Sequence, residues 1–261
     1  MVRQNILHWD WLVYVEMFIA GIAAGAYVTA AMLSVLGRGR SPVARAAHLL
    51  AFPLMALAGV LLIVDLDRPE RFWHMILQSE RVPLPMLKWW SPMSVGSWAV
   101  LIFSGFTFVS FVDALIDRGM FGIGPWRQGR TLHGSPLGVL WSLAGGAVAF
   151  FIAAYSGVLL TVTRLPGWRE SNLIGPLFLA TAAATGMAAL ILIQAVRGQV
   201  DTVEVAQLEG ANALVIVWQM LLLVAFLLTL GDAARILLTG LSLLAIVGAF
   251  VLGGVVPLLL W

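Results

Sequence analysis

Long apolar stretches alternate with short polar or charged segments along the whole chain. A helix that crosses the hydrocarbon core of a bilayer needs about 20 mostly apolar residues. The stretches that meet this requirement are 11–36, 46–65, 93–115, 137–163, 173–196, 211–230 and 236–258. The pattern therefore predicts an all-α fold, a polytopic transmembrane helix bundle with seven spans. Small residues such as Gly21, Gly25 and the run 180–186 predict that some of these helices pack closely.

The amino-acid composition agrees with a protein that lies mostly in a membrane. Of the 261 residues, 61% are hydrophobic and 11% are charged, and the mean hydropathy is +0.97. Soluble domains carry about 25% charged residues, so the bilayer must solvate much of this surface. The net charge is only +2 and the basic residues are dispersed, which favours membrane lipid as a partner and argues against nucleic acid.

Cysteine and histidine usage limits the cofactors that the chain can hold. The chain has no cysteine, so it cannot bind an iron–sulfur cluster or zinc through thiolates. A transmembrane haem needs two axial side chains at similar depth, and among His8, His48, His74 and His133 only His48 falls within a predicted span. Other metal sites lack a ligand set at suitable spacing. We therefore expect no haem, no iron–sulfur cluster and no metal site in this chain.

The connections between the spans predict the orientation. Short connections with several arginines favour the cytoplasm, and the first and third connections are of this kind. We therefore expect a multi-pass protein of the cell inner (cytoplasmic) membrane with its N-terminus on the outer side. The second connection, 66–92, is long, aromatic and mixed in charge. We expect it to fold over the bundle or to bind another protein.

Polar residues gather at the end where the first span begins, which we call the entry face. The polar residues there are Tyr14, Glu16, Asp65, Asp67, Arg68, Arg71, Trp73, His74, Tyr155, Ser156, Thr161, Thr163 and Arg164. Glu16 leads because a carboxyl group inside a span is costly and usually faces a cavity or a partner, and it can exchange protons with a ligand. The opposite face holds mainly arginines and is expected to be an ordinary rim.

Each of these candidates also has an ordinary structural alternative. Glu16 could be a rim carboxylate that reaches water, because it lies only about five residues from the start of its span. Tyr155 could belong to an interfacial aromatic belt. Asp65, Asp67 and Arg68 could form an ion pair that caps the end of the second span.

Three segments carry a resemblance to a known family. They are EMFIAGIAAGAY at 16–27, DLDRPERFWHM at 65–75 followed by SPMSVGSW at 91–98, and YSGVLLTVTRLPGW at 155–168. Together they resemble the NrfD/PsrC-type membrane subunits of molybdopterin-containing oxidoreductases, the polysulfide reductase group. The resemblance covers the first four spans, span five agrees loosely, and DLDRPERFW is its most specific part.

This resemblance implies a site for menaquinone or ubiquinone in a first four-helix bundle. A ferredoxin-like iron–sulfur subunit would dock at that face and would itself carry a molybdopterin catalytic subunit. By position, Tyr155 would bind the quinone headgroup, and Tyr14 and Met17 would occupy contact positions in span one. Met17 cannot donate a useful hydrogen bond, so Glu16 or Tyr14 would replace that contact.

The remaining candidates receive roles from the same resemblance. Glu16, or Asp65 with Asp67, would pass protons to the aqueous side. The pocket mouth, the docking surface and further cofactor contacts would come from Arg68, Arg71, Trp73, His74 and Arg164.

The domain division and two departures from the family complete the prediction. We expect residues 1–164 to form the first bundle, with the quinone site and loop 66–92, and residues 165–261 to form a second, incomplete one. Relatives commonly have eight or more spans, so either a final helix is missing here or the second bundle is reduced. Span six carries Asn212 and Gln219 where several relatives have acidic residues. The alternatives are a proton-conducting or solute-transporting protein without a redox role, and a passive membrane anchor.

Overall fold

The computed structural model describes residues 11–66, 68–77, 85–119, 132–161, 171–199, 202–231 and 234–260. Within these ranges the chain is helical apart from turns and one isolated bridge between Leu77 and Pro85. Seven helical segments of the described chain are long and apolar enough to cross a membrane. The predicted all-α bundle with seven spans is therefore confirmed.

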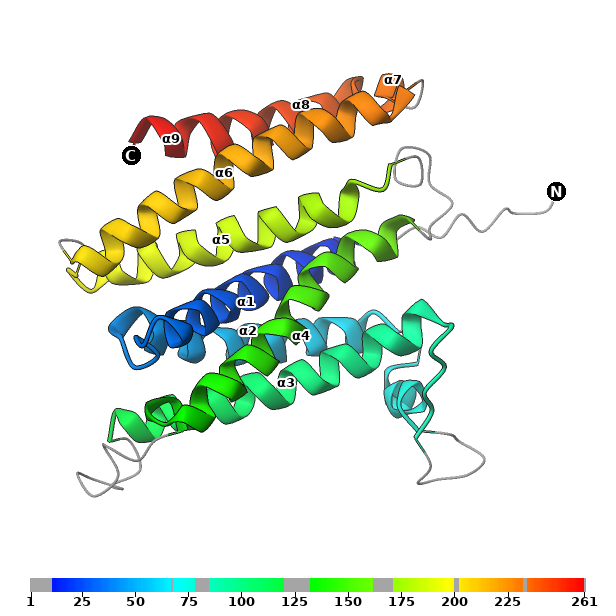
Figure 1. Ribbon diagram of the computed structural model, residues 1–261. Coiled ribbons are helices and arrows are strands. Elements are labelled where there is room, and N and C mark those ends of the chain that lie inside the picture. The colour runs from blue at the N-terminus through cyan, green and yellow to red at the C-terminus, as the bar shows by residue number, and fades with distance from the viewer. Residues whose placement is uncertain are drawn as a thin grey trace.

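The first six spans are single helices that run side by side (Figure 1). They are α1 (Trp11–Val35), α2 (Pro42–Val64), α3 (Pro92–Asp117), α4 (Pro136–Thr161), α5 (Ile174–Val196) and α6 (Val203–Thr229). Prolines open α2, α3 and α4, where the fixed φ angle of proline suits the first helical turn. Ser41 and Thr202 cap α2 and α6 by accepting hydrogen bonds from backbone N–H groups three residues later.

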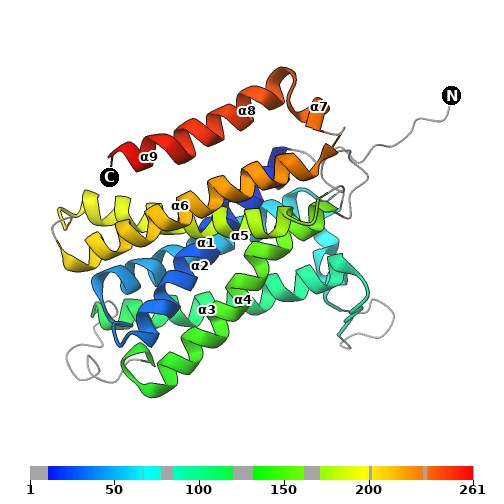
Figure 2. The same cartoon turned by 45° about the horizontal axis from the view of Figure 1, so that its top comes forward.

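Shorter elements complete the chain. The last span combines α8 (Gly240–Phe250), a π-helical turn η5 (Val251–Val255) and α9 (Val256–Leu260), preceded by the short α7 (Ala234–Leu237). It lies along α6 at the edge of the bundle (Figure 2). Two 3₁₀ helices, η1 (Pro69–Met75) and η3 (Leu132–Gly134), precede α3 and α4.

Helix α1 is central because α2, α4 and α5 all pack against it. Its approach to α5 is close: a Cβ atom added at Gly25 would lie 1.9 Å from the Ala182 carbonyl oxygen. A Cβ added at Gly186 would lie 2.4 Å from the backbone of Gly25 and Ala26. Small residues thus bring the two backbones together, as predicted. Helix α5 packs on both α1 and α4, and the division at residues 164 and 165 stays a prediction.

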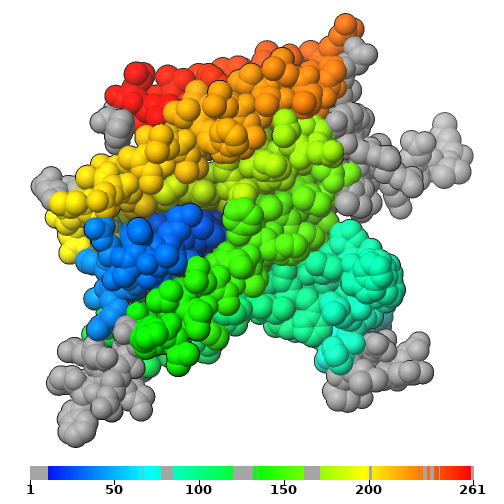
Figure 3. All heavy atoms as spheres, viewed as in Figure 1, coloured from blue at the N-terminus to red at the C-terminus, as the bar shows by residue number. Residues whose placement is uncertain are grey.

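The outer surface of the bundle is apolar. Leu192, Leu214 and Leu228 are among many large hydrophobic side chains that point away from the bundle and are more than 60% exposed. Figure 3 shows one face of the bundle, on which α4 (green) passes beside the N-terminal helices (blue), and α5 (yellow-green) and α6 (yellow to orange) lie on their other side. A surface of this kind suits a lipid environment, so the chain is a multi-pass membrane protein.

Candidate functional site

The entry face lies at the right-hand end of Figure 1. Helices α1, α3 and α5 begin there, and α2 and α4 end there. The 3₁₀ helix η1 directly follows the end of α2 and lies at the same end (Figure 1). Elements far apart in sequence therefore meet at this face.

A cavity of about 230 Å³ lies between α1, α4 and α5, near the entry face. Its lining consists of Tyr14, Met17, Phe18 and Gly21 of α1, Ala153 and Ser156 of α4, and Phe178, Thr181, Ala182 and Thr185 of α5. Tyr14 and Phe18 are 44% and 56% exposed, so the cavity is open to the outside of the bundle. Two predicted residues, Tyr14 and Met17, thus share one mostly apolar cavity.

Hydroxyl groups supply most of the polar lining of this cavity. The Ser156 hydroxyl donates a hydrogen bond to the Ile152 carbonyl at 3.1 Å. The hydroxyls of Thr181 and Thr185 donate to the carbonyl groups four residues earlier, each at 2.8 Å. Because these hydrogens are used within the helices, the oxygens keep lone pairs that can accept a hydrogen bond. The cavity therefore suits a mostly apolar molecule that carries an O–H or N–H group.

Glu16 lies in the first turns of α1, one position before the cavity residue Met17. Its side chain is buried, with 8% of the residue exposed. Among the described residues, none forms a hydrogen bond or an ion pair with its carboxyl group. A buried carboxyl group inside a span is a candidate for a functional role.

Tyr155 of α4 faces α3 and does not line the cavity, although the next residue, Ser156, does. Its hydroxyl donates a hydrogen bond of 2.5 Å to the Pro92 carbonyl, and its ring stacks on Phe151. The ring lies over Gly96 of α3, where an added Cβ would come within 2.5 Å of the tyrosine oxygen. The structure therefore places the Tyr155 hydroxyl apart from Tyr14 and Met17, against the start of α3.

The described parts of the second connection are attached to the start of α3. The Met86 carbonyl accepts hydrogen bonds from the Trp98 indole at 2.9 Å and from the Ser94 hydroxyl at 3.3 Å. The Met86 N–H donates to the Ile76 carbonyl at 2.7 Å. Two side chains of the SPMSVGSW stretch, Ser94 and Trp98, therefore fasten the second connection to the start of α3.

The other predicted residues that the structure describes share the entry face but do not line the cavity. Asp65 caps the end of α2 and is exposed. Arg68 precedes η1 and is exposed, and the rings of Trp73 and His74 within η1 are in contact, with centroids 3.8 Å apart. Asp67 and Arg164 lie outside the described residues.

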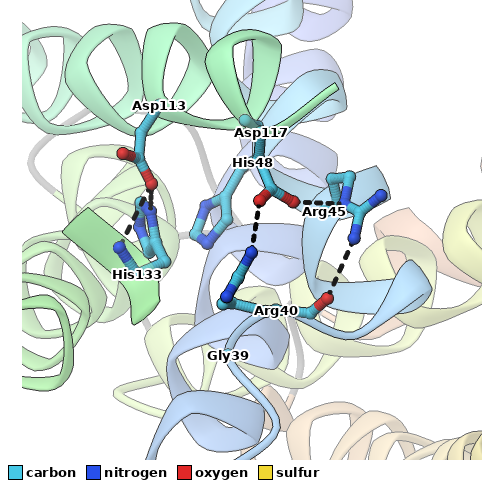
Figure 4. A pocket seen from close by; sticks show the side chains of 8 residues that line it. Gly39, Arg40, Arg45, His48, Asp113, Asp117 and His133 are labelled. Atoms are coloured by element: carbon cyan, nitrogen blue, oxygen red, sulfur yellow. Dashed lines mark hydrogen bonds and ion pairs between the residues drawn. The ribbon is translucent and has the colours of Figure 1, made fainter. Parts of the chain in front are cut away.

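The opposite end of the bundle holds a group of charged side chains, in which two largely buried aspartates face two partly exposed arginines (Figure 4). Asp117, near the end of α3, pairs with Arg40 at 2.7 Å and with Arg45 at 3.1 Å. Asp113, one turn earlier, accepts hydrogen bonds from the His133 ring and from the backbone N–H groups of Leu132 and His133. This end is therefore more than the ordinary rim of arginines expected from the sequence.

Two histidines also meet at this end. The rings of His48 and His133 are in contact, with centroids 4.1 Å apart, and His48 is 2% exposed. Figure 4 shows His48 beside His133 and close to Asp117. The expectation that no two histidines would lie at similar depth is wrong, because η3 brings His133 to the start of α2.

Comparison with known proteins decides the family. The chain matches the model of the family described as polysulphide reductase, NrfD, over residues 2–261. The chain belongs to the NrfD family. Among relatives of this NrfD-family protein, the C subunit of polysulfide reductase from Wolinella succinogenes is 27% identical over 245 residues, which cover 88% of this chain and 71% of that protein. Protein NrfD from Escherichia coli strain K12 is 24% identical over 247 residues, which cover 88% and 74%. The family predicted from the three segments is confirmed.

Sequence reasoning missed the α5 side of the cavity in this NrfD-family chain, which supplies four of its ten lining residues. Phe178, Thr181 and Thr185 of α5 line it, whereas the sequence analysis assigned the run 180–186 to packing only. Thr181 and Thr185 are four residues apart, so they lie on one side of α5. The signal in the sequence that could have pointed to the α5 lining was two hydroxyl groups on one side of an otherwise apolar span.

Proposed function

We propose that this NrfD-family protein is the quinone-binding membrane anchor subunit of a multi-subunit redox complex. In this proposal the headgroup of menaquinone or ubiquinone binds in the cavity between α1, α4 and α5, where its reduced, quinol form can donate its O–H groups to the hydroxyl oxygens. It exchanges electrons with the nearest cluster of a ferredoxin-like iron–sulfur subunit, which carries a molybdopterin catalytic subunit. The observation that carries the proposal is the cavity itself, a mostly apolar space with hydroxyl acceptors near the entry face.

The size and the opening of the cavity fit a headgroup better than a whole ligand. Pockets that enclose small molecules usually measure roughly 300–1,000 Å³, and this one measures about 230 Å³. Only the ring of a quinone needs to enter the cavity, because the apolar isoprenoid tail can stay in the lipid. The exposed sides of Tyr14 and Phe18 mark the route along which the tail would leave.

Proton exchange would accompany the electrons in this proposal. Reduction of a quinone to a quinol takes two electrons and two protons, and the protons bind the two quinone oxygens. Glu16 can donate a proton in its neutral form and accept one in its ionised form, and it lies one position before Met17. Alternatively, Asp65 with Asp67 would pass the protons to the aqueous side. Direct contact of Tyr155 with the headgroup stays a prediction. In the structure the Tyr155 hydroxyl donates a hydrogen bond to the Pro92 carbonyl.

The iron–sulfur subunit would dock on the second connection. Arg68 and Arg71 are exposed there, as are Phe72, Trp89 and Trp90. Aromatic and arginine side chains are enriched in protein interfaces. A partner on this surface would bring its cluster to the same end of the bundle as the cavity, which electron transfer requires.

The orientation proposed in the membrane follows from the charges at the two ends. The end opposite the cavity carries Arg38, Arg40, Arg45, Arg118 and Arg197. This concentration favours the cytoplasmic side of the inner membrane. The N-terminus, the cavity and the docking surface would then lie towards the outer side.

A titration of the purified complex with a quinol-analogue inhibitor tests the proposal. Thr185→Val removes one hydroxyl from the cavity, and Thr29→Val is the matched control. The Thr29 hydroxyl makes the same bond to a carbonyl four residues earlier (2.9 Å) but does not line the cavity. We expect Thr185→Val to weaken binding by about threefold to tenfold, the effect of one hydrogen bond, with the control unchanged.

The outcomes separate the three candidate functions. Loss of quinone-linked turnover in Glu16→Gln, with the analogue still bound, would support proton exchange at Glu16. No binding of the analogue, or binding insensitive to Thr185→Val, would contradict the cavity assignment and leave a passive anchor or a transporter. A transporter is less well supported, because such proteins use interrupted helices at the midplane and α2 continues through Pro53.

A further inference from the structure

A small pocket at the end opposite the cavity is lined by buried polar atoms that lack partners. Among the described residues, both ring nitrogens of His48 and Nε2 of His133 have no hydrogen-bond partner. Both histidines line the same pocket, whose volume is about 10 Å³. A buried water needs about that much space and two to four polar partners. The pocket therefore has the size and the polar lining for one water molecule.

Each of the two imidazole rings has a nitrogen lone pair to which a proton can add. His133 Nδ1 lies 2.5 Å from the Asp113 carboxylate, which fixes the ring hydrogen on that side when the carboxylate is ionised. Nε2 of His133 then presents a lone pair towards the pocket. Neutral His48 also has one nitrogen with a lone pair, and its ring lies against that of His133 at 4.1 Å. Among side chains, an unperturbed histidine is the one that changes its charge between about pH 5 and pH 8.

The surrounding charges come from every element packed around the pair. Helix α3 supplies Asp113 and Asp117, while Arg40 and Arg45 at the start of α2 pair with Asp117. Both arginines pair with Asp117, whereas Asp113 faces His133, so Asp113 is the carboxylate that can balance a proton held by the rings. Arg118 lies at the outer margin, where burial, followed by the charges of Arg197 of α5 and of Arg45, lowers its pKa.

We propose that His48, His133 and Asp113 form a buried proton-binding site that takes up one proton from the arginine-rich end of the bundle. The pair holds a single proton because two charged rings in contact would repel each other. The proton adds to a ring nitrogen lone pair, and no electrons are transferred. Asp113 balances its charge through His133, and the water in the pocket carries it between the Asp117 side and the rings.

The site holds a proton and does not pass it to the other end. On its inner side, the Tyr27 ring contacts His48 edge-on at 5.4 Å. The Tyr27 hydroxyl is hydrogen-bonded to Ser110 at 2.9 Å. Beyond Tyr27, the hydrophobic cluster of described residues towards the entry face consists of alanines together with Met55, Phe103 and Ile152, and these side chains cannot carry a proton. The proposal is thus independent of the quinone site.

Nuclear magnetic resonance of the full chain tests the site, with histidine labelled by ¹⁵N and the protein held in lipid nanodiscs. The four histidines are assigned by replacing each in turn with glutamine. We expect His48 and His133 to take up one proton between them at a common midpoint as the pH falls. Asp113→Asn should lower that midpoint by at least one pH unit, a tenfold loss of proton affinity, and Asp113→Glu should restore most of it. His74→Gln, at the entry face, is the matched control and should leave the midpoint unchanged.

Two results would overturn the proposal. One is that both rings stay neutral down to pH 5 in the wild-type chain while His74 titrates, and this result needs no variant that has to fold. The other is that the two rings titrate at separate midpoints that neither His133→Gln nor Asp113→Asn moves, in variants whose thermal unfolding matches that of the wild type.

Discussion

Replacement of Gly25 by alanine tests the closest approach between α1 and α5. The added Cβ would lie 1.9 Å from the Ala182 carbonyl oxygen and 2.7 Å from its carbon, whereas ordinary contact begins at 3.4 Å. The obstacle is backbone, which cannot rotate away as a flexible side chain can. The helices must therefore separate by more than 1 Å or lose their contact.

The expected cost follows from known effects of overpacking. Extra methyl groups in tight cores cost about 1–3 kcal/mol, and a clash with backbone belongs at the upper end. Alanine is better than glycine in a helix by about 1 kcal/mol, so the net loss in unfolding free energy should be about 2 kcal/mol. Gly105→Ala in α3 is the control, because an added Cβ there meets nothing within 4 Å. It should be neutral or stabilising by up to about 1 kcal/mol.

Reversible unfolding in mixed micelles, driven by increasing detergent denaturant, measures both variants. The account predicts a difference of about 2–3 kcal/mol between Gly25→Ala and Gly105→Ala. Because α1 and α5 also enclose the cavity, Gly25→Ala should in addition weaken binding of a quinol analogue. Equal stabilities of the two variants, within about 0.5 kcal/mol, would refute the close approach of α1 and α5.

Three further predictions concern single contacts. Ser110→Ala should lower the unfolding free energy by about 1–3 kcal/mol in the same assay. The loss should exceed that of Tyr27→Phe, because Ser110→Ala leaves the buried Tyr27 hydroxyl without its 2.9 Å hydrogen bond. The reverse order would contradict this reading. Trp98→Phe removes the 2.9 Å hydrogen bond to the Met86 carbonyl, so hydrogen exchange of the Met86 amide should become faster. Unchanged exchange would show that other contacts hold the connection in place. Asp117→Asn should lower the unfolding free energy by no more than about 1 kcal/mol, because the two arginines that pair with Asp117 are 33% and 41% exposed. A larger loss that high salt does not reduce would contradict this expectation.

The spans could be predicted from the sequence because the bilayer imposes their length. The largest error in a boundary is at α6, which begins at Val203 and not at residue 211. Its first two turns contain Glu204, Gln207 and Glu209, so they fail a test of apolar length. They are helical because Thr202 caps them and because a helix can extend beyond the hydrocarbon core.

The two sites could be predicted only in part, because they depend on which helices meet. Tyr14 and Met17 were named from the family resemblance at span one, and the structure puts both at the cavity. The contribution of α5 depends on its packing against α1, which periodicity does not encode. The contact of His48 with His133 joins residues 85 positions apart in the chain, through the fold of η3 onto α2. Local patterns carry no information on such a contact.

Photolabelling of the complex in its membrane with a quinone analogue that carries a photoreactive headgroup tests the central claim most directly. The account predicts that the label attaches to α1 between Tyr14 and Gly21 and to α5 between Phe178 and Thr185, and that excess natural quinone prevents it. Labelling that falls on the apolar outer faces of α6 and α8, or that quinone does not displace, would contradict a quinone site in the cavity between α1, α4 and α5.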